Sequence, residues 1–108
     1  MTPAQALRQP NAAAAKYLED EINALHPTEL ILKVYDFAIA GCRQHDADKV
    51  SRALVELIAA LNFEHRQIAL PLFRLYEYCM RSVKAGQFDA ALPILWELRE
   101  AWQQVVSR

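Results

Sequence analysis

One long stretch with almost no charge constrains the fold of this chain more than any other feature. The run LILKVYDFAIAGC, residues 30–42, contains only two charged side chains, Lys33 and Asp36. Pro27 and Glu29 stand just before it, where a proline suits the first turn of a helix and an acid suits its positive end. At about 100° per residue, the charged positions form one narrow strip. The sequence therefore predicts a helix whose apolar surface is much wider than the stripe of roughly 100° that a surface helix needs.

The apolar surplus of this helix lies on two flanks. Leu30 and Phe37 widen the apolar face on one side. Leu32 and Ile39 widen it on the other, and the following helix has a similar surplus beside its own core stripe. Taken singly, such residues are more often core than surface, but five short helices cannot enclose two neighbouring helices completely. We expect the surplus to form a groove for an amphipathic helix, with either flank as the open one. The predicted groove residues are Leu30, Leu32, Phe37, Ile39, Val55, Ile58 and Ala59.

The composition indicates a single helical domain. With 108 residues, of which 54% are hydrophobic and 23% charged, the chain can bury one core. Only two glycines in the whole sequence favour helices over many short strands. Twelve basic and thirteen acidic side chains give a net charge of -1, which argues against a nucleic-acid partner. No apolar run reaches the roughly 18 residues of a membrane span, so we expect no membrane insertion.

Turn and cap signals divide the chain into five predicted helices. Residues 1–10 carry two prolines and are expected to form a flexible arm. In chain order, the first two predicted helices cover about residues 11–24 and 27–44. The third runs from the turn at 45–48 to about residue 62, and the last two cover about residues 67–85 and 89–106. Pro71 and Pro93 are expected in or near the first turns of their helices, or Pro71 is expected to kink its helix. Because the connections are short, we predict an all-α fold. The predicted architecture is an antiparallel four-helix bundle with an additional short N-terminal helix or cap. Together these form one predicted domain of residues 11–108.

The sequence offers no catalytic or metal centre. His26, His45 and His65 all fall at predicted helix ends or in turns. None belongs to a Glu-x-x-His pair of the kind that builds metal sites in helical bundles. Cys42 and Cys79 lack Cys-x-x-Cys spacing and lie on apolar helix faces, so we expect them to be reduced core residues. We therefore expect no enzyme activity and no cofactor, and a metal- or cofactor-binding bundle enzyme is the least supported hypothesis.

The large aromatic side chains are expected to be core or boundary residues rather than binding residues. They are Tyr35, Tyr76, Tyr78, Trp96 and Trp102. A tyrosine that is buried needs a hydrogen-bond partner for its hydroxyl group. Asp36 and Arg81 are predicted to form a structural ion pair between the second and fourth predicted helices.

Short motifs then occur in a specific order along the chain. One starts at Ala69 and has the form A-x-x-L-x-x-L-Y-x-Y. In chain order, the motif residues are Pro27, Glu29, Leu30, Val34, Tyr35, Asp36, Ala69, Leu72, Leu75, Tyr76, Tyr78, Met80, Arg81, Leu92, Leu98, Arg99 and Trp102. Their order and spacing resemble the FliS family of flagellar export chaperones over nearly all of residues 14–102.

The resemblance implies a function without catalysis. Chaperones of this family bind the C-terminal segment of new flagellin in the bacterial cytoplasm, keep it from polymerising and deliver it to the export gate. The client segment, which is disordered when free, forms helices against apolar surfaces of the chaperone. The resemblance also implies a cap over that surface, at Tyr17 and Leu18. We expect a monomer or a weak homodimer. The alternative is a helical homo-oligomerising interaction module with a different client.

Overall fold

The described part of the chain is entirely helical. The structure is a computed structural model that describes residues 27–107. Its elements are α3 (Pro27–Arg43), α4 (Ala47–Ala59), the short 3-10 helix η1 (Phe63–His65), α5 (Arg66–Lys84) and α6 (Phe88–Val106). No strand occurs between residues 27 and 107, so the predicted all-α class is confirmed. The predicted arm, the predicted helix at 11–24 and the predicted cap residues Tyr17 and Leu18 lie outside the described residues.

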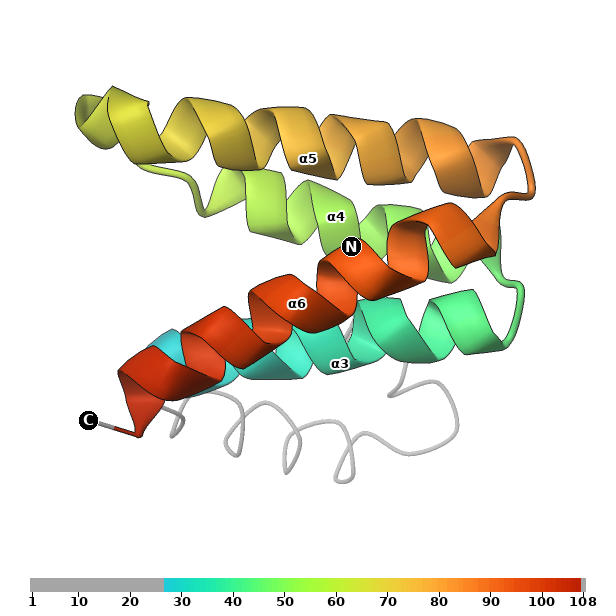
Figure 1. The fold of residues 1–108 in the computed structure, drawn as a ribbon, viewed down its shortest axis with the longest axis horizontal. Coiled ribbons are helices and arrows are strands. Elements are labelled where there is room, and N and C mark those ends of the chain that lie inside the picture. The colour runs from blue at the N-terminus through green and yellow to red at the C-terminus, as the bar shows by residue number, and fades with distance from the viewer. Residues whose placement is uncertain (1–26, 108) are drawn as a thin grey trace, which may run out of the picture. The chain divides into compact units, whose positions relative to one another are not determined.

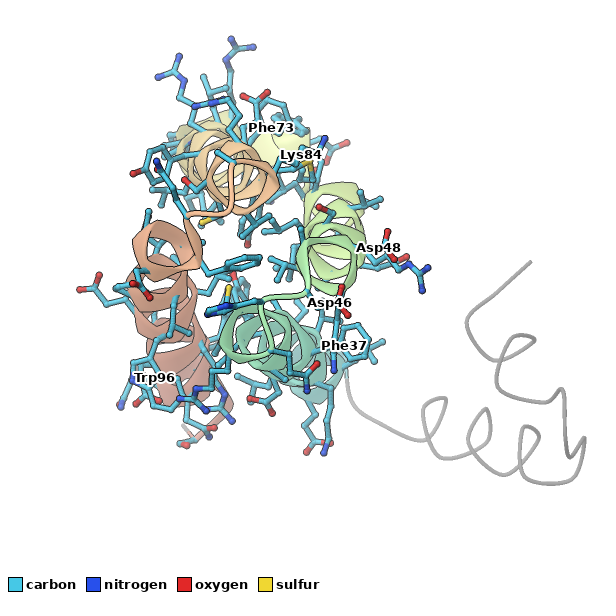
Figure 2. All side chains as sticks on the ribbon, turned by 90° about the vertical axis from the view of Figure 1, so that its right-hand side faces the viewer. Phe37, Asp46, Asp48, Phe73, Lys84 and Trp96 are labelled. Atoms are coloured by element: carbon cyan, nitrogen blue, oxygen red, sulfur yellow. The ribbon has the colours of Figure 1, made fainter. Side chains whose placement is uncertain are left out.

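The four long helices surround one interior. From Ile31 onward the chain forms one compact unit. In Figure 1 the chain runs along α3, returns along α4, runs out again along α5 and returns along α6. The end-on view in Figure 2 shows α5, α4, α3 and α6 at successive corners around that interior. Turns of three residues, 44–46 and 85–87, join the helices of each hairpin.

Each helix contributes one apolar stripe to the interior. In α4 the stripe is Val50, Leu54 and Leu57, which are at most 3% exposed, as the helical period predicts. The other buried cluster members are Tyr35, Ala38, Ile39 and Cys42 from α3, Ala53 from α4, Tyr76, Cys79 and Val83 from α5, and Ala91 and Leu95 from α6. Leu75 of α5 is 37% exposed and does not belong to this cluster. Both cysteines are buried and free, which confirms the prediction of reduced core thiols.

Helix ends follow the local chemistry of the sequence. The Asp46 side chain caps α4 by accepting a hydrogen bond from the Lys49 backbone N–H at 3.1 Å. Gly86, with φ of 77°, ends α5 in the left-handed conformation that glycine adopts without strain. Pro71 and Pro93 each lie five residues after the first residue of their helix, inside α5 and α6, so the predicted first-turn placement was too early. Both helices continue past their proline.

The crossing of α3 over α4 depends on Gly41, which has no side chain to separate the two helices. A Cβ atom there would lie 2.8 Å from Val50 Cγ2 and 3.1 Å from the Val50 backbone nitrogen. We expect Gly41→Ala to lower the free energy of unfolding by about 1 kcal/mol, because crowding outweighs the gain in helix propensity. Urea denaturation of both proteins measures this change.

The same substitution in a Val50→Ala background provides the control for Gly41. Without the Val50 methyl group at 2.8 Å, Gly41→Ala should cost less than it does in the wild-type background. A Gly41→Ala protein that is more stable than wild type by about 1 kcal/mol would show that propensity alone decides this position.

Candidate functional site

Two of the predicted groove residues belong to the core. Leu32 is 8% exposed and Ile39 is 3% exposed. They lie on the flank of α3 that also carries Asp36, whose carboxylate pairs with Arg99 of α6. This flank packs toward α6 and leaves neither aliphatic side chain open to a partner.

The opposite flank of α3 is the open one. Leu30 is 38% exposed and Phe37 is 48% exposed. The Lys49 Nζ atom lies 4.6 Å from the centre of the Phe37 ring, so this flank faces the N-terminal half of α4. The ammonium group and the ring attract each other, and at an exposed site such a contact contributes about 0.5–1 kcal/mol.

The predicted groove residues of α4 differ in burial. Val55 is 54% exposed, Ala59 is exposed, and Ile58 is half-buried against the core. Val55 and Ala59 follow Asp48 and Arg52 at helical spacing on the exposed face of α4, where Arg52 and Asp48 form an ion pair at 2.8 Å. Figure 2 shows Asp48 pointing outward from α4, between Phe37 on one side and Phe73 on the other. Because Leu32 and Ile39 belong to the core, the seven predicted residues do not form one exposed surface.

Two aromatic residues meet beyond the C-terminal end of α4, one from η1 and one from α5. Phe63, in η1, is 49% exposed, and its ring meets the ring of Phe73 edge-on with centroids 6.2 Å apart. We name the set Val55, Ile58, Ala59, Phe63 and Phe73 the α4–α5 surface. Phe63 and Phe73 were not predicted as site residues, although an apolar Phe63 in a short connection was a visible signal.

An apolar cavity of about 220 Å³ lies at the end of the unit where α4 ends and α5 begins. It is lined by Ile31, Leu57, Ala60, Leu61, Asn62, His65, Ile68, Ala69, Leu72, Tyr76 and Trp102. Only Asn62, His65 and the aromatic polar atoms could offer hydrogen bonds there. Its size and lining suit an apolar side chain rather than a polar substrate.

The hydroxyl groups of the two buried tyrosines form a hydrogen bond with each other. The hydroxyl oxygens of Tyr35 and Tyr76 are 2.5 Å apart, and both side chains are at most 2% exposed. Burial raises the pKa of both phenols, and Trp102 is a further hydrogen-bond partner of Tyr35. In the described range, no buried side-chain nitrogen or oxygen atom is left without a partner. The pair is therefore a structural link between α3 and α5.

The predicted ion pair between Asp36 and Arg81 is wrong. Asp36 accepts a hydrogen bond from Arg99 Nε at 2.5 Å, which links α3 to α6. This bond raises the pKa of the Arg99 guanidinium above its ordinary value. Arg81 is exposed on α5, and the packing order around the interior gives Asp36 a neighbour from α6 instead.

The described residues contain no grouping of three or more His, Cys, Asp or Glu side chains that could hold a metal ion. His45 instead stacks on Phe88, with ring centroids 5.0 Å apart and planes 5° from parallel. His65 ends η1 and lines the apolar cavity. Among residues 27–107, no helix is long and apolar enough to cross a membrane.

Comparison with known proteins identifies the family. Neither the curated proteins nor the solved structures contain a match to this chain. A family model described as flagellar protein FliS matches residues 9–108. The match covers all four described helices and the connections between them. The chain therefore belongs to the FliS family of flagellar proteins.

Proposed function

We propose that this protein is a flagellar export chaperone. It binds the C-terminal segment of flagellin in the bacterial cytoplasm, prevents premature polymerisation and delivers the segment to the export apparatus. The match to the FliS family over residues 9–108 carries this proposal. The protein acts by binding, without catalysis or a cofactor, and its four described helices form an antiparallel bundle.

The α4–α5 surface is the proposed main contact for the client. Val55 and Phe63 are each about half exposed, and the Phe63 ring pairs with that of Phe73. An amphipathic helix presents apolar side chains at every third or fourth position, which suits such a row. Ordering a disordered client costs about 2–5 kcal/mol, so apolar burial has to supply the affinity.

The remaining predicted groove residues have secondary roles in this proposal. Leu30 and Phe37 form a second client contact on the open flank of α3. Tyr17 and Leu18 form the proposed N-terminal cap, which competes with the client. Leu32 and Ile39 support α3 from inside. An aspartate at Ile39 is expected to unfold the protein rather than test binding, because the side chain is 3% exposed.

Titration with a synthetic peptide of the flagellin C-terminal segment tests the client surface. The peptide should gain helicity on binding, as measured by circular dichroism. Val55→Asp and Phe63→Asp should each weaken binding at least about tenfold, equivalent to about 1.4 kcal/mol. Desolvating the introduced carboxylate against the apolar client causes this loss.

Val105→Asp is the matched control for Val55→Asp. Val105 is 50% exposed on α6, so the same substitution is made at similar exposure on another helix. Binding by this control should stay within about twofold of wild type, because a rim charge away from the contact has little effect. Wild-type affinity in both Val55→Asp and Phe63→Asp would refute the α4–α5 surface. A stable dimer at micromolar concentration that is lost in Val55→Asp would favour the homo-oligomer instead.

A further inference from the structure

A tryptophan stands in solvent on the side of the molecule that the client surface does not use. Trp96 of α6 is 45% exposed. Figure 2 shows it pointing away from the interior at the corner between α6 and α3, far from Phe73. Tryptophan has a large apolar surface, and exposed tryptophans beside arginines are typical of binding hot spots.

Two arginines flank the exposed indole ring. The Arg43 Cζ atom lies 5.8 Å from the ring centre, and the Arg99 Cζ atom lies 6.0 Å from it. Arg99 is fixed by its bond to Asp36 and by a longer contact with Glu100 at 3.6 Å, and its side chain is only 20% exposed. This anchoring holds one wall of the site in place before any ligand arrives.

Arg43 provides the charge that a ligand can use. It lies in the last turn of α3, and no carboxylate in residues 29–107 forms an ion pair with it. Asp36 is neutralised by Arg99, whereas Glu97 and Glu100 are exposed on α6 close to Trp96 in sequence. With two acids on the same helix as Trp96 and a net charge of -1, the chain suits a nucleic acid poorly.

We propose that Trp96, Arg43 and Arg99 form a second docking surface for a short protein segment in which a carboxylate neighbours a large apolar side chain. The apolar side chain packs on the part of the indole ring that the two guanidinium groups leave exposed, and the carboxylate pairs with the guanidinium of Arg43. The α3–α6 corner and the α4–α5 surface use different residues, so a partner can bind here while the α4–α5 surface is occupied. This inference stands without the proposed flagellin chaperone function.

Nuclear magnetic resonance of the 15N-labelled full chain tests the surface, because each indole N–H gives its own signal. The Trp96→Phe variant assigns the signals of Trp96 and Trp102. The probe is the peptide acetyl-Gly-Leu-Glu-Leu-Glu-Gly-amide, compared with versions that carry Gln or Lys in place of Glu. The Glu peptide should shift the Trp96 signal saturably, and the Gln peptide should bind about threefold to fivefold more weakly. The Lys peptide should leave the signal unchanged.

Arg43→Gln should weaken binding of the Glu peptide by the same factor that separates the Gln peptide from the Glu peptide on the wild-type protein. Arg52→Gln, which removes an exposed arginine on α4, is the matched control and should leave binding unchanged. The proposal is overturned if the Lys peptide binds as well as the Glu peptide, or if no signal moves at millimolar peptide. It is also overturned if the Trp102 signal moves instead, or if a thymidine oligonucleotide shifts Trp96 more than the Glu peptide does. A Trp96 shift that follows protein concentration without peptide assigns the surface to a second copy and likewise overturns it.

Discussion

Raising the pH from 9 to 11 is expected to lower the free energy of unfolding by about 2 kcal/mol from Cys79 alone. Burial raises the pKa of this thiol from 9.0 to about 11. Between these two values, the unfolded chain loses the thiol proton and the folded protein keeps it. The folded state then binds more protons than the unfolded state, so stability falls as the pH rises.

Three further buried groups act in the same direction. Burial raises the pKa of Cys42 and of both phenols in the Tyr35–Tyr76 pair. The thiol contributes above about pH 8.5 and the phenols above about pH 10, where the unfolded chain ionises them. Each group contributes its full stabilisation at pH values below its pKa in the unfolded chain. This stabilisation is lost as the pH rises from there through the pKa of the group in the folded protein. The loss should therefore steepen above pH 10.

Urea denaturation in a reducing buffer at half-unit pH steps from 8 to 11 measures this dependence. Cys79→Ala should flatten the slope between pH 9 and 11, because the titrating thiol is gone. Val50→Ala is the control, since it removes buried apolar volume without a titratable group and should lower stability equally at every pH. Stability that stays constant to pH 11 would contradict the raised thiol and phenol pKa values.

Local sequence signals predicted the ends of α3, α5 and α6 to within one residue, but they placed the end of α4 near residue 62, whereas the helix ends at Ala59. Asp46 and Gly86 carry cap and stop chemistry that acts within a few residues, and the structure uses both. The apolar period predicted the buried stripe of α4, because a helix can bury only one face against a shared core. These features depend on neighbours along the chain, which a single sequence contains.

The choice between the two flanks of α3 could not be predicted from the sequence. Leu32 and Phe37 have the same apolar character in the sequence, but one faces α6 and the other the exposed side near Lys49. That difference depends on the order of the helices around the interior. The same order gives Asp36 a partner on α6 rather than Arg81 on α5. For this reason, some of the predicted groove residues are buried and others are exposed. Phe73 belongs to the proposed surface only because its ring contacts Phe63.

The apolar and the polar surfaces differ in how firmly they are held. The α4–α5 surface relies on side-chain packing, with Phe63 in a short 3-10 helix that has no buried residue. The α3–α6 corner is fixed by the ion pair between Arg99 and Asp36. An adaptable apolar surface suits a client that folds on binding, whereas an unpaired guanidinium group beside an anchored one suits a short segment that is recognised by its charge.

Leu54→Ala is expected to lower the free energy of unfolding by about 2–5 kcal/mol. Leu54 is 0% exposed at the centre of the core, so truncation removes apolar burial and leaves a cavity. A domain of this size has a total stability of about 5–15 kcal/mol, so the variant loses a large fraction of it. Urea denaturation at neutral pH measures the difference from wild type.

Val55→Ala, one residue further along α4, separates core from surface. Val55 is 54% exposed, so this truncation should change stability by no more than about 0.5 kcal/mol. Its effect should appear in binding of the flagellin peptide, which loses apolar contact at the α4–α5 surface. Equal losses of stability in the two variants would mean that Val55 is buried in the free protein, and it could not then be an open contact for a client helix.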